Sequence, residues 1–492
     1  MSASFSENPP LNGHYWPTLA VVLLALCPHI IVTTAYQFLM PAMTMDLDGA
    51  QRVLKVAEGL SNAGYACGAV IAGFLMQRIP QRHAFMVAET GCVAGFVIAA
   101  VAPGADVFAV GRILQGVATG FLLVFAVPPL VTRFSAKRLP ISAAAINIAF
   151  FGAVTAGPLI GAVVAPELWR WLYAALGGLG FIGLVLSYFA FPRQSPPNPE
   201  QSPDWPAFIY ALLGTALPFY AVSRLGDSVS FGSLIFWLPM TIGLGCLVAL
   251  IVTQYRSHDG LIPMHKVWHS VPLAGTLAAM VGGAAYVTFL LVAELFLEKV
   301  LKIGSTAAGL AQWPGVIALL VVALIFYRVF CTRFLPHLVL VGMLLLIAAG
   351  AALMTLGTDT STVLLLGVSA ALGAGAGAVV SPGLFFAALA VESTYLGRVF
   401  ALVELVRSEA DFLIGPTMEH VAMLHGHSGA ALAAGLREAV WVTLGLLVVT
   451  VGAILALYIG SGARPHRPNL DVWLNDGGQA LGSPAVRFGR RR

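Results

Sequence analysis

The chain has 492 residues, of which 59% are hydrophobic and only 10% are charged. Soluble globular domains carry about 25% charged residues, so this composition excludes a soluble protein of this length, and it also excludes a largely disordered chain. The net charge of +4 is too small to indicate a protein that binds nucleic acid. What remains is an all-α polytopic membrane protein.

Fourteen apolar stretches are long enough to cross a bilayer as helices, since a spanning helix needs about 20 residues. They are much longer than the strands of a membrane β-barrel. We expect the first stretch to stay in the protein as a helix, because no Lys or Arg precedes it as in a cleaved signal peptide. The predicted spans are 17–40, 56–76, 84–103, 107–131, 141–164, 173–191, 206–223, 231–253, 270–297, 308–329, 337–357, 363–390, 396–418 and 436–459.

A polar, proline-rich segment, PRQSPPNPEQSPDWP, follows the sixth span and is incompatible with a helix. We interpret it as a linker between two halves of the protein. The predicted organisation is an N-terminal six-helix bundle (1–191), a linker with two additional spans (192–254), a C-terminal six-helix bundle (255–459) and a tail (460–492). The additional spans are expected to form a peripheral hairpin.

The placement of Lys and Arg predicts the orientation of the chain. Most of these residues fall on the side of both termini when the fourteen spans are threaded in order, and such an excess marks the cytoplasmic side. We therefore expect an integral protein of the cell (inner) membrane with both termini in the cytoplasm. The tail is polar and closes with three arginines, so we expect it to be disordered and either solvated or in contact with anionic lipid.

Three short motifs fall on or beside the second to fifth spans. They are GFLMQRIPQR (73–82), GRILQGVATG (111–120) and GAVTAGPLIG (152–161). Glycines allow helices to approach closely in lipid, an arginine inside a span needs a partner, and a proline bends its helix. The residues that carry these features are Gly73, Arg78, Arg82, Arg112, Gln115, Gly116, Gly157, Pro158 and Gly161.

In this order and on these spans, the motifs resemble those of the major facilitator superfamily, and more narrowly its fourteen-helix drug:proton antiporter branch. The first is similar to the loop motif GxLaDRxGRR, the second to RxxQG of the fourth helix, and the third to the antiporter motif GxxxxGPxxGG of the fifth. WRW at 169–171 and TT at 33–34 are similar to further signatures of the branch. The resemblance implies the major facilitator fold, in which two six-helix bundles surround a central cavity, with two extra helices.

The chain departs from these patterns at several positions. Val32 stands where the first-helix pattern has an aspartate, and Gln77 and Pro80 replace the Asp and the inner Gly of the loop motif. The third motif ends in Gly-Ala instead of Gly-Gly. The first departure removes a charge that exporters of this branch often use for cations. We expect Gly157 and Pro158 to contact the C-terminal bundle, where a bend and a bare backbone permit sliding.

The thirteenth span carries the densest group of intramembrane charges. At 100° per residue, Glu404, Arg407 and Asp411 fall within about 60° of one another, and Arg407 is spaced to pair with both carboxylates. Glu409 points about 140° away from Glu404. The resemblance implies a functional glutamate at the position of Glu404. The group is either a site for proton or substrate coupling or a structural triad of salt bridges.

Other ionisable residues inside spans are further candidates. Arg112 is expected to bond hydroxyls or carbonyls of the first span, and the resemblance implies a part in proton transfer. Glu294 either faces the cavity or is structural, whereas Glu298 is expected to reach the membrane interface. Glu89 is expected to pair with a basic residue of the nearby inner turn.

The motifs that are missing from the sequence narrow the function. No Walker motif is present, so transport has to run on an ion gradient or on the gradient of the substrate. No nucleophile–base arrangement and no metal-ligand spacing of Cys or His stands out, so we expect neither an enzyme nor a metal or cofactor. The leading hypothesis is proton-coupled efflux of a small organic molecule by a monomer in the lipid bilayer, without nucleic-acid partners. The alternatives are uptake of a small metabolite and, less favoured, a receptor or scaffold.

Overall fold

The computed structural model describes residues 10–164, 168–192, 195–196, 198–226, 229–257, 260–261, 264–357 and 360–486. Most of this part of the chain is helical, and its extended pairing is limited to two isolated bridges. The first half contains α1 (Tyr15–Asp46), α2 (Gln51–Arg78), α3 (Gln81–Ala100), α4 (Ala105–Thr132), α5 (Leu139–Asn147), η1 (Ile148–Gly152), α6 (Ala153–Val163) and α7 (Trp169–Ala190).

The second half follows an additional pair of helices, α8 (Trp205–Ser223) and α9 (Leu234–Arg256). It contains α10 (Met264–Val267), α11 (Ser270–Leu295), η3 (Phe296–Val300), α12 (Ser305–Leu310), α13 (Trp313–Val329), α14 (Leu335–Met354), α15 (Thr362–Leu389), η4 (Ser393–Tyr395), α16 (Leu396–Met423), α17 (Gly429–Gly460) and α18 (Leu470–Asn475). The π-helical segments η1 and η3 continue the helices before them.

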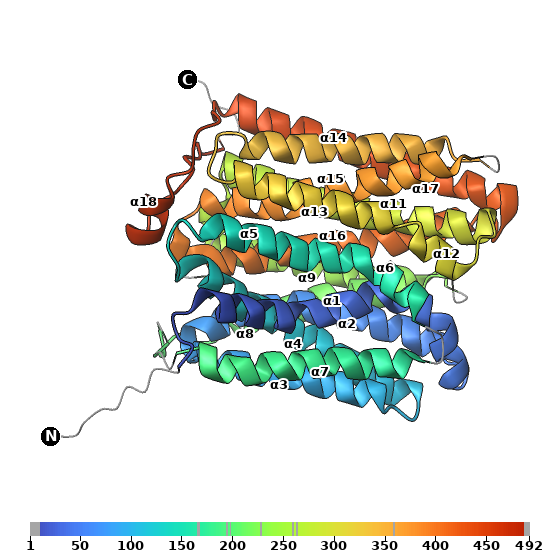
Figure 1. Ribbon diagram of the computed structural model, residues 1–492, viewed down its shortest axis with the longest axis horizontal. Coiled ribbons are helices and arrows are strands. Elements are labelled where there is room, and N and C mark those ends of the chain that lie inside the picture. Colours follow the sequence, from blue (N-terminus) through green and yellow to red (C-terminus); the bar gives the residue numbers. More distant parts are fainter. Residues whose placement is uncertain are drawn as a thin grey trace.

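The helices lie side by side along one direction (Figure 1). Within the described residues, thirteen are long and apolar enough to cross a membrane by length and composition. The fourteenth is α16, which has 28 residues but carries the charged group predicted for this span. The all-α class and the fourteen-span arrangement predicted from the sequence are therefore confirmed.

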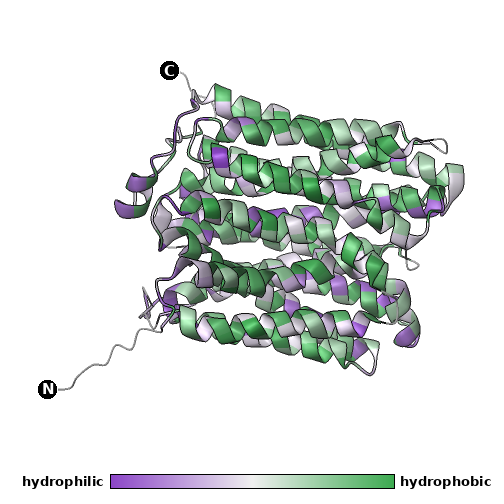
Figure 2. Cartoon of the chain, viewed as in Figure 1, coloured by the Kyte–Doolittle hydropathy of each residue, from purple (hydrophilic) through white to green (hydrophobic). Residues whose placement is uncertain are grey.

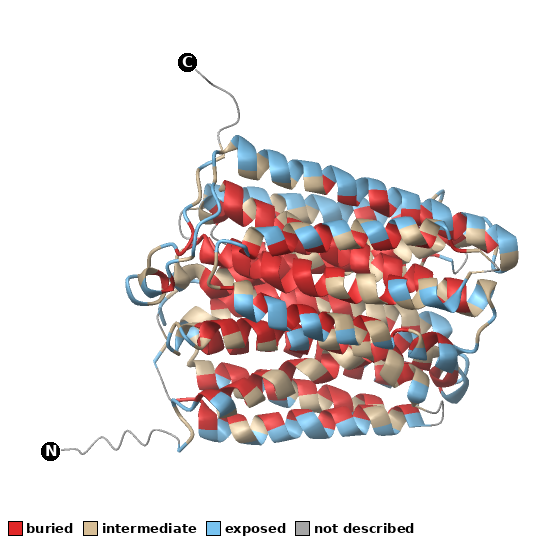
Figure 3. Cartoon of the chain, turned by 45° about the horizontal axis from the view of Figure 1, so that its top comes forward, coloured by how far each residue is buried: buried red, intermediate tan, exposed pale blue. Residues whose placement is uncertain are grey.

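The surface of the bundle is apolar along the helices. Hydrophobic residues follow the lengths of the helices and hydrophilic ones gather toward their ends (Figure 2), while buried residues concentrate in the centre (Figure 3). Large side chains such as Ile317, Leu324 and Val449 are exposed on outward faces. An apolar surface of this extent requires lipid around it, so the protein is an integral membrane protein.

Both ends of the described chain lie on the same side of the bundle, on the left of Figure 1. We call this the terminal side, where α1 begins and α17 ends, and we call the opposite one the far side. α2, α4 and α15 run from the far side to the terminal side, while α16 runs in the reverse direction. These directions fix which residues share a depth in the membrane.

The additional helices α8 and α9 form a hairpin. α8 packs against α2 and α16 as well as against α9, so the hairpin covers the line where the two halves meet. Close packing within it depends on Gly243, because a Cβ there would collide with the ring of Pro218 on α8. Much of α9 is exposed, as Leu234, Ile242 and Val248 show.

The tail differs from the disordered segment expected from its composition. The structure describes residues 461–486 of the tail. They include α18 and lie against the terminal side of the second half. Trp473 is fully buried, and its indole N–H donates to the carbonyl of Val391 at 2.8 Å. The amides of Ala480 and Leu481 donate to the carbonyl of Leu389. The sequence expectation failed because polar composition does not reveal one tryptophan and a few backbone contacts that fix a segment.

Candidate transport site

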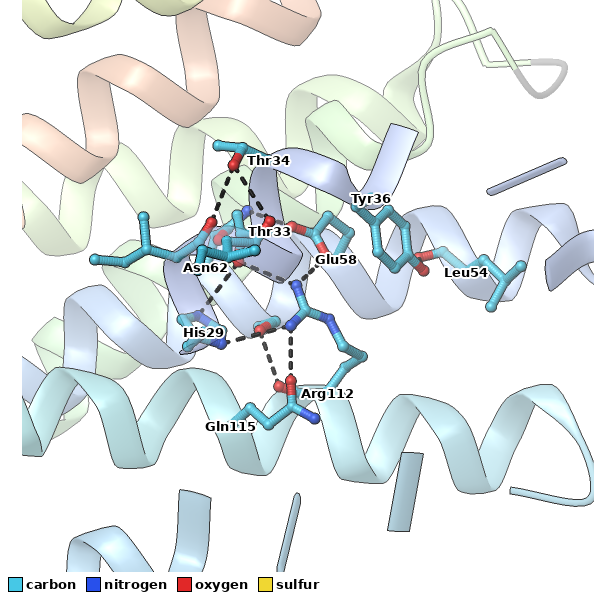
Figure 4. Close-up of polar contacts among 12 residues, drawn as sticks. His29, Thr33, Thr34, Tyr36, Leu54, Glu58, Asn62, Arg112 and Gln115 are labelled. Carbon is cyan, nitrogen blue, oxygen red and sulfur yellow. Dashed lines mark hydrogen bonds and ion pairs between the residues drawn. The ribbon is translucent and has the colours of Figure 1, made fainter. Parts of the chain in front are cut away.

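A buried arginine on α4 organises the first polar cluster (Figure 4). Arg112 is fully buried, and its Nη2 donates to Oε2 of Glu58 on α2 at 2.5 Å. The same nitrogen donates to Oγ1 of Thr33 on α1 at 3.2 Å, and Nη1 donates to Oε1 of Gln115 at 2.8 Å. Nη1 also lies 3.5 Å from Nδ1 of His29. Three helices therefore supply the partners that an arginine needs in lipid.

Glycines on α4 bring α2 close enough for this pairing. A Cβ on Gly116 would collide with the carbonyl of Ser61, and one on Gly120 would collide with that of Tyr65. Ser61 Oγ donates to the carbonyl of Arg112 at 2.8 Å, which ties the two helices together. The expected contact of Arg112 with a hydroxyl of the first span is present, but Glu58, which the sequence reading missed, supplies the opposite charge.

A second cluster joins the two halves of the molecule. Arg407 donates through Nε at 3.0 Å and Nη2 at 2.5 Å to Oε2 of Glu404, and through Nη1 to Oδ2 of Asp411. Tyr65 on α2 donates its hydroxyl to the same Oε2 of Glu404 at 3.0 Å. Glu404 and Asp411 are buried, and the side chain of Arg407 between them is 11% exposed. Both ion pairs that the sequence spacing predicts are therefore present. The hydrogen bond from Tyr65 of the other half was not predicted.

Asp411 is pressed against the backbone of α11. Its Oδ2 meets Arg407, but its Oδ1 is buried without a hydrogen-bond partner among the described residues. A Cβ on Gly283 would lie 2.7 Å from Oδ1, so only a glycine fits at this point of α11. The carboxyl group therefore sits where a small shift of α11 or α16 changes its surroundings.

His29 and Tyr65 connect the two clusters. The His29 ring stacks on the Tyr65 ring with a centroid distance of 6.5 Å and an angle of 20° between the planes. His29 contacts Arg112 on one side, and Tyr65 contacts Glu404 on the other. The polar groups thus form a chain from the interior of the first half to α16 of the second.

The two halves also touch at both ends of their interface. On the terminal side, Gly397 of α16 packs against Met76, and a Cβ on Gly73 would lie 3.8 Å from that of Ala401. On the far side, a Cβ on Gly309 would lie 2.9 Å from the carbonyl of Pro158. The two halves are therefore in contact near both ends of their interface in this conformation.

The sequence profile described as the Major Facilitator Superfamily matches residues 22–416. The chain belongs to the major facilitator superfamily. Proteins of this family are transporters and not enzymes, which agrees with the missing nucleophile–base arrangement of the sequence. The family also accounts for the two bundles of helices.

Curated relatives of this transporter are distant. It is 22% identical over 275 residues to the uncharacterized MFS-type transporter YubD of Bacillus subtilis, covering 55% of this chain and 53% of that protein. It is 25% identical over 334 residues to the multidrug resistance protein B homolog of Mycobacterium tuberculosis, covering 67% and 61%. It is 23% identical over 318 residues to the fatty acid resistance protein FarB of Neisseria gonorrhoeae, and the match covers 63% of this chain and 61% of that protein. The chain thus spans between about half and three-fifths of these relatives.

Solved structures of the superfamily share its fold. The human organic anion transporter MFSD10 aligns with a TM-score of 0.63 at 15% identity, covering 90% of this chain and all of that one. The proton:xylose symporter XylE aligns with a TM-score of 0.62 at 12% identity, covering 90% and 95%. At such identities the likeness concerns the fold alone.

The residues of the loop motif lie at the terminal side of the transporter. Gly73 faces Ala401 across the interface between the halves, and Arg78 is exposed in the last turn of α2. Arg82 is buried on α3, with its guanidinium 4.3 Å from the ring centroid of Tyr188. Gly73 thus contacts the second half.

The residues of the antiporter-like motif on α6 contact two different helices, α1 and α12. Gly157 packs against α1, since a Cβ there would collide with Oγ1 of Thr34, and a Cβ on Gly161 would lie 2.9 Å from the carbonyl of Ala35. The expectation that Gly157 contacts the C-terminal bundle is therefore wrong. Pro158 does meet that bundle at Gly309. The error arises because adjacent helix residues point about 100° apart.

Three further buried carboxylates lie apart from the two clusters. Glu89 on α3 has no hydrogen-bond partner within the described chain, so the predicted pairing with a basic residue is wrong. Its Oε1 lies instead against α7, at 3.2 Å and 3.4 Å from where Cβ atoms on Gly183 and Gly180 would stand. Glu294 and Glu409 are also buried with unpartnered oxygens.

Proposed function

We propose that this transporter exports small organic compounds in exchange for protons by alternating access. The observation that carries the proposal is the cluster of Glu404, Arg407 and Asp411, because it is buried in one half and bonded through Tyr65 to the other. A titratable group at a moving interface links protonation to conformation.

The proposed coupling acts through charge-assisted hydrogen bonds. While Glu404 is ionised, it accepts hydrogen bonds from both Arg407 and Tyr65, and such bonds are stronger than neutral ones. A proton on Glu404 weakens both. The attraction between α2 and α16 then falls, and the equilibrium shifts toward a conformation in which the halves separate at this depth. Asp411 also pairs with Arg407, so the arginine keeps an ionised partner while Glu404 is protonated.

The chain of contacts from Glu58 and Arg112 through His29 to Tyr65 gives a second link. We infer that changes at the α2–α4 pairing reach Glu404 through the stacked rings of His29 and Tyr65. In this series of contacts Arg112 supplies the positive charge and holds Glu58 and His29 at one depth in the membrane. Glu294, buried on α11, is a further candidate for contact with substrate.

Export and small organic substrates are supported by resemblance. The motif around Gly157 is similar to the antiporter motif, and relatives include proteins named for multidrug and fatty acid resistance. In this proposal the protein acts as a monomer in the inner membrane with cytoplasmic termini, and a proton gradient is its driving force without a cofactor. The alternative, supported by the solved symporter fold, is uptake of a small metabolite.

The deciding experiment uses purified full-length protein in proteoliposomes with an imposed pH gradient and a panel of amphipathic compounds. Wild-type protein should accumulate a substrate against its gradient when the pH gradient has the antiport direction. Glu404→Gln should abolish this accumulation but keep downhill exchange, since the amide preserves size without carrying a proton. Glu438→Gln, on an exposed side chain at the far side, is the matched control. Normal accumulation by Glu404→Gln would show that Glu404 is structural.

A further inference from the structure

Glu409 lies on α16 but is turned away from the cluster around Arg407. It is 8% exposed, and neither of its carboxylate oxygens has a hydrogen-bond partner among the described residues. At 100° per residue it points about 140° from Glu404 and about 160° from Arg407. It cannot share the arginine that holds Glu404 and Asp411.

Its neighbours in helical register show what Glu409 faces. The Phe412 ring meets the ring of Phe219 on α8 at a centroid distance of 5.7 Å, and the His420 ring meets that of Phe231 between α8 and α9 at 5.0 Å. Leu413 packs against the apolar cluster formed by the two helices of the hairpin. All three lie within about 60° of Glu409 around the helix, so Glu409 points toward the hairpin.

Among the described residues, the middle of the hairpin brings no opposite charge to this carboxyl group. The part of α8 between Ala211 and Phe219 and the part of α9 between Leu234 and Thr253 contain no Asp, Glu, Lys, Arg or His. The neighbouring elements carry titratable groups at other positions. These are Arg52, Lys55, Glu58, Tyr65, Cys67 and Arg78 on α2, Asp106 and Arg112 on α4, Tyr210 and Tyr220 on α8 with Arg224 at its end, Cys246, Tyr255 and Arg256 on α9, Tyr286 and Glu294 on α11, Arg437, Glu438 and Tyr458 on α17, and Arg398, Glu404, Arg407, Asp411, Glu419 and His420 on α16 itself.

We propose that Glu409 and the α8–α9 hairpin form a second proton-binding site, separate from the cluster around Arg407 and shielded from the lipid by the hairpin. An unpaired carboxylate in an apolar surrounding is costly, and a bound proton relieves that cost. Because α8 also packs on α2, separation of α2 from α16 disturbs the hairpin and exposes the carboxyl group. Use of this proton in transport rests on the proposed function, but its binding does not.

Infrared difference spectroscopy of the full chain in lipid vesicles tests proton binding without any substrate. At neutral pH, wild-type minus Glu409→Gln spectra should show the C=O stretching band of a protonated carboxyl group, which gives way to carboxylate bands at alkaline pH. Glu89→Gln is the matched control, since it removes another buried, unpartnered acid and should leave the Glu409 band in place. Carboxylate bands of Glu409 already at neutral pH would overturn the proposal. Glu409→Asp, which should shift the band in frequency, serves if the amide variant fails to insert.

A second measurement tests the shielding by the hairpin. In D₂O the Glu409 band shifts as the carboxyl proton exchanges, and this exchange should be slow in the wild-type protein. Phe219→Ala removes the ring that meets Phe412 and should accelerate the exchange severalfold. An unchanged exchange rate in Phe219→Ala would show that the hairpin does not shield the site. Because neither readout involves transport, failure of proton-coupled export leaves both intact.

Discussion

Arg407 illustrates how one side chain holds two buried carboxylates. It pairs with Glu404 and Asp411 at the same time, and both acids lie almost entirely inside the protein. Removing one member of a buried ionic group costs more than removing the whole group, because the remaining charges lose their partners. The cluster is therefore sensitive to which member is changed.

Arg407→Ala should destabilise the protein by about 3–5 kcal/mol, because it leaves two carboxylates unpaired. Thermal unfolding of the purified protein in detergent would measure this loss. The triple variant Glu404→Gln, Arg407→Ala, Asp411→Asn should recover much of the stability. A triple variant no more stable than the single one would mean that Arg407 acts by packing instead of charge.

The partners of these residues show the limit of sequence reading at this scale. Glu404, Arg407 and Asp411 lie on one helix, so their spacing was sufficient to predict their pairing. Glu58 and Tyr65 lie on another helix, and spacing along one helix does not determine which residues of a second helix it meets. One signal was available: Glu58 and Arg112 are each the eighth residue of parallel helices that begin on the far side, and hence share a depth.

At the scale of the element, the close packing of α2 on α4 depends on glycines that have no side chain. Gly116→Ala should push α4 away from Ser61, since the added Cβ has no space. We expect lower thermal stability and a weakened Glu58–Arg112 pair, measured as an earlier melting transition. Gly178→Ala on α7 is the control, because a Cβ there meets nothing within 4 Å. Equal melting of the two variants would contradict this account.

Within the described residues, thirteen helices are long and apolar enough to be predicted as spans from these two properties, whereas α16 was predicted as a span despite its charged group. The two errors within elements, at Gly157 and Glu89, both concern rotation about the helix axis. Gly157→Leu, for example, is now expected to disrupt packing on Thr34 inside the first half. Where a residue lies along the membrane normal is encoded locally, but which neighbour it meets depends on the whole bundle.

On the scale of the whole molecule, alternating access requires the contact at the terminal side to open. A Cβ on Gly73 would lie 3.8 Å from the Cβ of Ala401, which suits a disulfide. In a background without the five native cysteines, Gly73→Cys with Ala401→Cys should cross-link on oxidation and stop transport in proteoliposomes. Reductant should restore it.

The two single-cysteine variants are the controls and should transport under both conditions. Full transport by the oxidised, cross-linked double variant would mean that the terminal side does not need to open. The proposal of alternating access between these halves would then fail.

The tail also belongs to the molecule as a whole, since it closes the terminal side of the second half. Trp473→Ala should cost about 3–5 kcal/mol through the cavity left by a fully buried indole. Thermal unfolding would measure it, with the exposed Trp441→Ala as control. Similar melting temperatures would show that the tail contributes little to stability.

The packed tail has a consequence for how the protein is made. Residues 469–485 leave the ribosome after all fourteen helices, yet they cap the carbonyl groups of Leu389 and Val391 and pair with the start of α11 at Ser270. The second half therefore completes these hydrogen bonds only after its last spanning helix has been made. A chain stopped before Trp473 would still contain every described spanning helix, but the carbonyl groups of Leu389 and Val391 would lack these partners.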